Sequence, residues 1–132
     1  VMEQLTRNFH RKEFDCKDGT KVPIDFKNNL IELAVNLQKL RDDLGSTIVI
    51  SSGYRTPKYN KRVGGAKFSQ HLIACASDLS QSKESPLELY KRIERLIKEG
   101  KMHNGGLGLY NTFVHYDIRQ EPTRWNNSKF RI

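Results

Sequence analysis

Two histidines and one aspartate stand in segments whose residue types could hold a metal ion. His71 and Asp78 are seven residues apart, with mostly small or apolar residues between them, and His115 follows in a strand-like run. Two imidazoles and a carboxylate suffice for a catalytic zinc site, which uses three protein ligands and leaves the fourth position to water or substrate. The alternative is that each histidine is an ordinary polar residue, satisfied by hydrogen bonds and binding no metal.

The spacing indicates which elements must position these side chains. The seven-residue separation of His71 and Asp78 differs from that of the helical H-E-x-x-H motif, whose two histidine ligands lie one helical turn apart. It fits one ligand at the end of an element and another on an adjacent strand. Along residues 113–119, strand alternation places His115, Asp117 and Arg119 on the same face. Asp117 could therefore act as a base or hold a metal ligand in orientation.

Two helices are predicted from hydrophobic periodicity and capping signals. Leucines and an alanine spaced three and four apart predict a helix over about residues 26–44, ended by Gly45. Ser85, Pro86 and Glu88 form a capping box that opens a second helix, which Gly100 ends. The buried faces of these helices predict a core.

Short β-branched and alternating runs predict the strands. Residues 47–50 are expected to form a strand central in a small sheet, and residues 105–110 and 112–119 a hairpin. The tail after residue 122 is expected to pack only Trp125. We therefore predict one α+β domain over residues 1–132, with a small, largely antiparallel sheet flanked by helices.

Composition narrows the classes of partner. The chain has 132 residues and a formal net charge of +8, which suits a polyanion such as nucleic acid or an anionic cell-wall polymer. The basic residues are dispersed and no nucleic-acid motif occurs, so we expect no specific nucleic-acid binding. No apolar run approaches the roughly 20 residues of a membrane helix. The first four residues lack a signal-peptide pattern, so we expect no cleaved signal in this chain.

The two cysteines, Cys16 and Cys75, do not form a C-x-x-C motif. Cys75 lies among small apolar residues and is most simply a buried thiol. A disulfide between the two stays open at this point.

Three ordered segments carry a resemblance to a known family. Residues 69–78 read S-Q-H-L-I-A-C-A-S-D, residues 52–60 read S-G-Y-R-T-P-K-Y-N, and residues 105–110 with 113–119 read G-G-L-G-L-Y and F-V-H-Y-D-I-R. They resemble the motifs of the zinc D-Ala-D-Ala carboxypeptidase family, which shares its fold with hedgehog-type proteins. The resemblance extends from about Leu5 to Trp125. One departure is Ala74, where the family usually has glycine.

The resemblance implies a site as well as a fold. It implies one zinc ion per chain on His71, Asp78 and His115, and a substrate contact by Arg55, which also stabilises the developing oxyanion. It further implies substrate contacts by the residues that flank these groups, Ser69 and Tyr54. Many relatives keep an acidic general base a few residues before the last histidine, where this chain has Thr112. Asp117 is the remaining candidate for the base, and its rival role is orienting a ligand.

The function implied is zinc-dependent hydrolysis of an amide bond in peptidoglycan stem or cross-link peptides. It would be of carboxypeptidase or endopeptidase type, acting at the cell wall, as in a phage-derived endolysin or virion component. One alternative is a zinc-containing wall-binding or virion structural module without activity. A second is a basic nucleic-acid binder.

Overall fold

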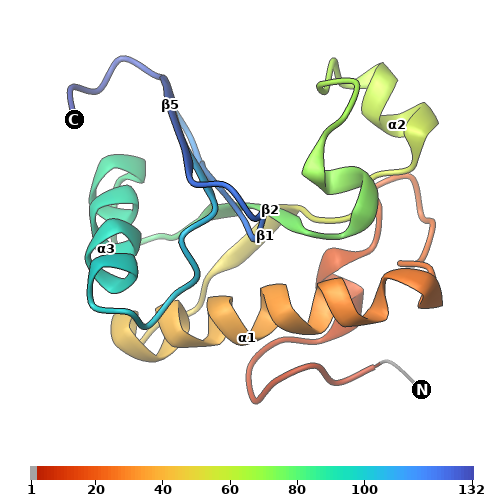
Figure 1. Ribbon diagram of the computed structural model, residues 1–132, viewed down its shortest axis with the longest axis horizontal. Coiled ribbons are helices and arrows are strands. Elements are labelled where there is room, and N and C mark those ends of the chain that lie inside the picture. Colours follow the sequence, from red (N-terminus) through yellow and green to blue (C-terminus); the bar gives the residue numbers. More distant parts are fainter. Residues whose placement is uncertain (1–2) are drawn as a thin grey trace.

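The computed structural model describes residues 3–132 and contains a five-stranded sheet with helices around it (Figure 1). The first two residues, part of the stretch without a signal pattern, lie outside the described residues. The strands are β1 Val49–Ser52, β2 Ala76–Ser80, β3 Gly106–Tyr110, β4 Val114–Asp117 and β5 Thr123–Asn127, in the spatial order β1-β2-β4-β3-β5. Only β3 and β5 pair in parallel. The predicted α+β fold with a largely antiparallel sheet is confirmed.

The two long helices form where the sequence signals placed them. Helix α1 spans Lys27–Leu44 and ends at Gly45, which takes the left-handed conformation with φ of 71°. Helix α3 spans Pro86–Lys98 and begins with the reciprocal capping box between Ser85 and Glu88. Both helices bury an apolar stripe, because residues three and four apart share one side of a helix.

Shorter helical segments complete the fold. Helix α2 covers Pro57–Arg62, and 3-10 turns cover η1 Arg11–Phe14, η2 Ile24–Phe26 and η3 Gln70–Ile73. Figure 1 shows α1 running along the strands. Helix α3 lies on one side of the strands, and α2 with η3 lies on the opposite side.

The two faces of the sheet differ in chemistry. One face contributes buried apolar residues, among them Leu79, Leu107 and Val114, to a core that also contains the stripes of α1 and α3. The opposite face carries Asp78 and His115, which are direct neighbours on β2 and β4. Since side chains alternate along a strand, burying the apolar set under the helices fixes the polar set on the other side.

Two strand predictions were wrong. The strand predicted as central, β1, lies at an edge of the sheet, because β-branched composition indicates a half-buried strand and not its position in the sheet. The tail does more than pack Trp125. It forms β5, the opposite edge strand, which pairs along its length with β3. A polar run such as T-R-W-N-N carries little strand signal, since only a long-range partner stabilises it.

Two further expectations concern membranes and thiols. Within residues 3–132, no helix is long and apolar enough to cross a membrane. Cys16 and Cys75 are both buried and free, so they do not form a disulfide. Burial raises the pKa of the Cys75 thiol to about 11.

Candidate metal centre

One row of directly paired residues crosses the polar face of the sheet. Ser52 pairs with Asp78, Asp78 with His115, His115 with Gly108, and Gly108 with Trp125. The row therefore takes one residue from each of the five strands. It sets an aspartate and a histidine side by side and leaves an empty position, Gly108, between His115 and the indole.

The third member of the site arrives from η3. Ser69 caps this turn by accepting a hydrogen bond from the backbone N–H of His71, at 3.1 Å. The backbone carbonyl of His71 accepts from the N–H of Arg55 at 3.0 Å, which ties η3 to the segment after β1. The turn ends at Ala74, whose φ of 59° and ψ of 31° are left-handed. A residue with a Cβ adopts this conformation at a cost of roughly 1–2 kcal/mol, which a glycine would avoid.

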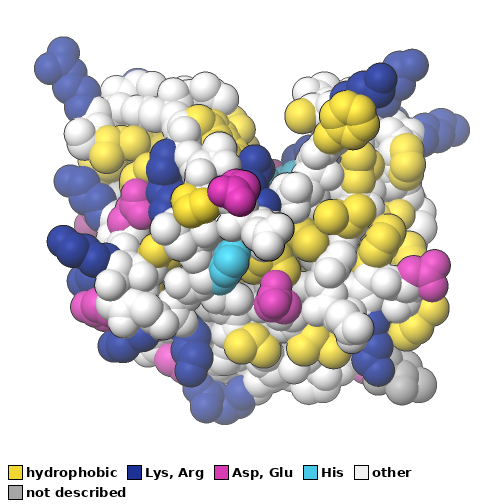
Figure 2. All heavy atoms as spheres, viewed as in Figure 1, with side chains coloured by type: hydrophobic (Ala, Val, Ile, Leu, Met, Phe, Trp, Pro, Cys, Tyr) yellow, Lys and Arg dark blue, Asp and Glu magenta, His cyan; other side chains and the backbone are white. Residues whose placement is uncertain are grey.

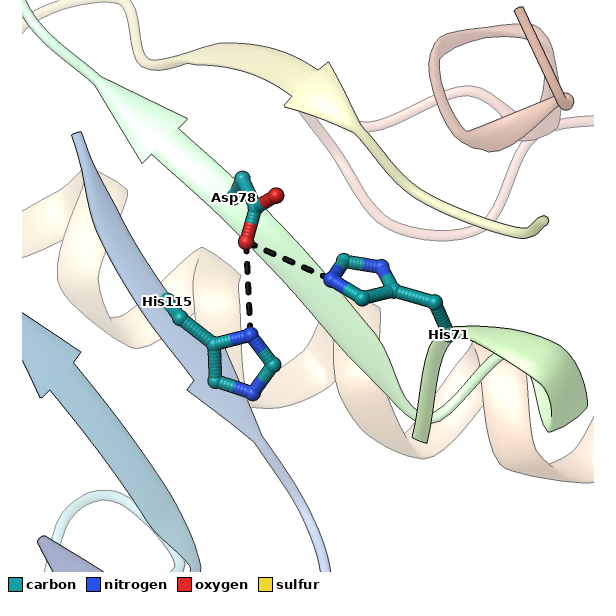
Figure 3. A group of neighbouring side chains, drawn as sticks. All are labelled: His71, Asp78 and His115. Atoms are coloured by element: carbon teal, nitrogen blue, oxygen red, sulfur yellow. Dashed lines mark ion pairs between the residues drawn. The ribbon is translucent and has the colours of Figure 1, made fainter. Parts of the chain in front are cut away.

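The three predicted ligands converge. The Nε2 atom of His71 and the Nδ1 atom of His115 each lie 3.3 Å from the same carboxylate oxygen of Asp78 (Figure 3). One ligand atom from each residue lies within 4.8 Å of the others, and all three side chains are buried. The structure thus brings together two imidazoles and a carboxylate that could hold one metal ion.

The outer nitrogen of each ring is already engaged. The Nδ1 atom of His71 lies 2.7 Å from the carbonyl oxygen of Gly53, and the Nε2 atom of His115 lies 2.6 Å from Asp117. A carbonyl or a carboxylate accepts a hydrogen bond, so each outer nitrogen carries the proton. The inner nitrogens then present lone pairs toward Asp78. Partners of this kind fix the tautomer and the ring orientation of metal-binding histidines.

The electrostatics of Asp78 reflect this arrangement. Burial by itself raises the pKa of a carboxyl group, but the imidazoles of His115 and His71, which donate to Asp78 when a second proton is on their inner nitrogens, outweigh it and hold the pKa of Asp78 well below its usual range. The carboxylate is therefore ionised, as a metal ligand must be.

Asp117 is fully buried behind His115. Besides the ring of His115, it accepts hydrogen bonds from the backbone N–H groups of Gly106 and Arg119 and from the guanidinium of Arg119, at 2.7–3.1 Å. Burial would raise the pKa of Asp117, yet the hydrogen bonds from His115 and Arg119 lower it far below the ordinary value. The carboxylate is ionised and has no exposed surface.

Arg55 lies next to the site and is held on three sides. Its Nε donates to Ser52, its Nη1 to Asn60 and its Nη2 to the outer carboxylate oxygen of Asp78, at 3.1–3.2 Å. The guanidinium therefore holds a predicted metal ligand in addition to facing the cleft. These partners follow from the S-G-Y-R-T-P-x-Y-N segment, which supplies Ser52 and Asn60 as well as Arg55.

A cleft of about 350 Å³ opens over the three ligands. Figure 2 shows the surface hollowed between the raised part that carries α2 and the part that carries β5. One wall comes from the loop that follows α2, including the strongly exposed Phe68, and the other from the aromatic side chains near β3, β4 and β5. Arg55 and Ser69 also line the cleft.

The position of Tyr54 does not support its expected substrate contact. Its side chain is buried in the core, with its ring 6.0 Å from that of Phe26, and it is absent from the cleft walls. Residues 53–55 follow β1 without a turn or bend, and Tyr54 packs into the core while Arg55 lines the cleft. Sequence adjacency to Arg55 is therefore a poor guide to its role.

The aromatic wall was not predicted. The rings of Tyr110 and Phe113 stack with their centres 4.4 Å apart, and the indole N–H of Trp125 donates to the Tyr110 hydroxyl at 2.9 Å. Alternation along β3 was an available signal, since Tyr110 shares the face of Gly106 and Gly108, which pair with Asp117 and His115.

The glycines of the G-G-L-G-L-Y segment create space for these groups. A Cβ on Gly106 would lie 2.3 Å from the Asp117 carboxylate, and one on Gly108 would lie 2.2 Å from the Trp125 ring. Because Gly108 has no side chain, the indole of Trp125 lies over it, and the centres of the Trp125 and His115 rings are 5.0 Å apart. The missing side chains of Gly106 and Gly108 thus let Asp117 and Trp125 pack closely around the metal centre.

Comparison with known families agrees with this geometry. A family model described as Peptidase M15 matches residues 7–117. The chain therefore belongs to the Peptidase M15 family. The match covers all three candidate metal ligands and ends before β5. A search of curated proteins found no match.

Proposed function

We propose that this protein is a zinc-dependent peptidase that hydrolyses an amide bond. The observation that carries the proposal is the convergence of two imidazole nitrogens and one carboxylate at the floor of an open cleft. This donor set fits zinc, which in catalytic sites takes three such protein ligands and keeps one open position. A zinc ion held by His71, Asp78 and His115 would supply Lewis acidity, which activates water and polarises an amide carbonyl.

The chain's own residues supply the orientation. Gly53 and Asp117 hold the two rings with their inner nitrogens toward Asp78, and Arg55 holds the far oxygen of Asp78. Arg55 keeps N–H groups beyond those three bonds, and these can donate to a substrate carbonyl as charge develops on its oxygen. Ser69 stands at the cleft wall beside His71, where its position supports a substrate contact.

The contacts of Asp117 support a positioning role. A general base must reach the proton that it removes. Asp117 has no exposed surface and already accepts bonds from His115, Arg119 and a backbone amide. We therefore assign Asp117 to the orientation of His115, and its use as the general base is the competing assignment.

The substrate we propose is a peptidoglycan stem or cross-link peptide, cleaved at the cell wall. Family membership supports a peptide substrate. The positive net charge supports attraction to anionic wall polymers. A role as a phage-derived endolysin or virion component is part of the same proposal.

Mass spectrometry of purified peptidoglycan after incubation with the zinc-loaded protein tests the proposal. We expect new stem peptides whose masses identify the hydrolysed bond. The matched control is His115→Ala, which removes one ligand and should release nothing. Intact peptidoglycan after incubation with fully zinc-loaded wild-type protein would contradict the proposal.

One observation favours a second candidate, a zinc-containing wall-binding or virion structural module. Among the residues that line the described cleft, Asp78 is the sole carboxylate, so the cleft wall offers no separate acid as a base. Wall binding without hydrolysis by the zinc-loaded protein would favour this candidate.

A further inference from the structure

The loop after α2 presents an apolar edge to the cleft. Val63, Ala66 and Phe68 line the cleft together with the two glycines between them, whereas Lys67 lines a separate hollow beside α2. Lys67 is the one charged residue among residues 63–68, all of which the structure describes. Figure 2 shows hydrophobic side chains over the raised part that carries α2, with Lys and Arg side chains at its outer edge. We call Val63, Ala66 and Phe68 the apolar lip.

Phe68 is the most exposed large hydrophobic side chain of the described residues, at 84%, and Val63 is 48% exposed. The ammonium of Lys67 lies 5.5 Å from the centre of the Phe68 ring, a cation–π contact that covers one face of the ring. The other face has no such cover. Contiguous apolar surface exposed at the wall of a cleft is typical of a ligand-binding site, since it gains free energy only when an occupant covers it.

The two sides of the cleft favour an occupant with a flat apolar part. Opposite the apolar lip stand the rings of Tyr110 and Phe113, which are within 10° of parallel. The three candidate metal ligands lie on the polar floor between these walls. An occupant that extends from the floor to the apolar lip therefore needs a polar part at one end and a neutral, flat apolar part at the other.

Peptidoglycan contains one component of that kind. The side chains of its stem peptides are short methyl, carboxylate and amine groups, none of which has a flat apolar face. The sugar rings of its glycan strands do have one, because the axial C–H groups of a pyranose lie on a single face. Such a face is neutral and matches the area of an aromatic ring.

We propose that Phe68 stacks on an N-acetylhexosamine ring of the glycan strand, so that the preferred substrate is a stem peptide still attached to its glycan. This inference rests on the proposed peptidase function. Phe68 and the three ligands border the same cleft of about 350 Å³, and an extended peptide advances only about 3.3–3.6 Å per residue. A sugar on Phe68 is therefore only a few residues away from the scissile bond.

Titration of the zinc-loaded protein with an N-acetylglucosamine tetramer tests the sugar contact without any peptide. Trp125 is the sole tryptophan of the chain and lines the cleft, so its fluorescence reports binding there. We expect saturable binding by the wild-type protein. Phe68→Leu keeps an apolar side chain without a flat face, and its affinity for the tetramer should fall about 2- to 10-fold, the range that aromatic stacking contributes.

Two further variants separate stacking from other effects. Phe68→Tyr keeps the flat ring and should retain the wild-type affinity. Phe130→Leu is the matched control, because the Lys129 ammonium lies 5.9 Å from the centre of the Phe130 ring and this pair does not line the cleft. It should leave the affinity for the tetramer unchanged.

The substrate preference is measured with one stem peptide in two forms, free and attached to its disaccharide. We expect kcat/KM to be higher for the attached form, and the ratio of the two values to fall about 2- to 10-fold in Phe68→Leu. The same ratio in wild-type protein and Phe68→Leu would overturn the proposed preference.

The sugar contact is overturned if the wild-type protein does not bind the tetramer, or if Phe68→Leu binds it as tightly as the wild type does. A loss of affinity for the free peptide alone would assign Phe68 to the peptide instead. Failure of the peptidase proposal looks different, since peptidoglycan would stay intact while the tetramer still binds in a manner that depends on Phe68.

Discussion

Asp117 connects three parts of the site through one carboxylate. Its oxygens accept from His115, from Arg119 and from the backbone of β3 at Gly106. Its burial separates it from the cleft, and its pKa, lowered by His115 and Arg119 against the effect of burial, keeps it ionised. These facts suit a residue that acts through another side chain.

Asp117→Asn separates orientation from base catalysis. If Asp117 orients His115, zinc affinity should fall on the order of 10–100-fold, and hydrolysis should recover when zinc is supplied in excess. Zinc content and hydrolysis are to be measured on the same sample. Full zinc occupancy with a rate loss of about 10²–10⁴-fold would instead identify a general base.

Arg55→Lys removes the fork-shaped donor and keeps the charge. We expect turnover to fall on the order of 10²-fold, because a lysine cannot bond Ser52, Asn60 and Asp78 and still reach a carbonyl. From the sequence alone, zinc content should stay unchanged. The bond from Arg55 to Asp78 now predicts some loss of zinc as well. Unaltered turnover would refute the assignment.

For single residues, the sequence predicted the three candidate metal ligands. It did not predict the groups that hold their rings in orientation. His71, Asp78 and His115 are residue types that bind metal ions, and their spacing resembles the motifs of a known family. The acceptor for His71 is the backbone carbonyl of Gly53, and a backbone oxygen leaves no trace in residue identity. Tyr54 lies in the core although its neighbour Arg55 lines the cleft, and sequence adjacency does not specify which of the two environments a side chain enters.

Strands β3, β4 and β5 together form one wall of the cleft. β5 lies beyond the part of the chain that matches the family model, yet it places Trp125 over Gly108 and against His115. The indole in turn donates to Tyr110. The last strand thus contributes to the metal centre without supplying a ligand.

Gly108→Ala tests this packing. The new methyl group would lie 2.2 Å from the Trp125 ring, so the indole must move away from His115. We expect a loss of about 1–3 kcal/mol in the free energy of unfolding, the usual cost of overpacking. Urea denaturation of the single variants and of Gly108→Ala with Trp125→Ala provides the measurement. The cost of Gly108→Ala should largely disappear in the Trp125→Ala background, and an equal cost in both backgrounds would contradict the packing model.

Local signals predicted α1 and α3 well, because caps and periodic leucines act within a few residues of one another. They failed for β1 and β5. Whether a strand is central or at an edge depends on partners distant in sequence, and β5 is stabilised by β3 rather than by its own propensity.

Charge is distributed unevenly over the whole molecule. Residues 44–77 contain five basic residues and no acidic ones. On α3, by contrast, Arg92 and Arg95 are ion-paired with Asp43, and Arg92 also with Glu84. Four of the five lie on α2 and its following loop, so about half of the net charge of +8 lies beside the cleft, although basic residues also occur elsewhere in the chain.

Attraction to an anionic wall should depend on this region. We expect cosedimentation with walls that contain anionic polymers to weaken as salt rises from about 50 mM to about 500 mM, since exposed charges are screened. Lys58→Gln with Lys61→Gln should weaken binding more than Lys91→Gln with Lys98→Gln, a matched loss of charge on α3. Equal effects of the two pairs would contradict a localised surface.

The central claim is that His71, Asp78 and His115 hold one zinc ion. Diffraction at the zinc absorption edge, from a crystal of the protein grown with zinc, tests it most directly. We predict one anomalous peak per chain, with His71 Nε2 and His115 Nδ1 at about 2.0–2.1 Å and a carboxylate oxygen of Asp78 at about 2.0–2.2 Å. A fully occupied peak elsewhere, or three side chains too far apart to share one ion, would contradict the account.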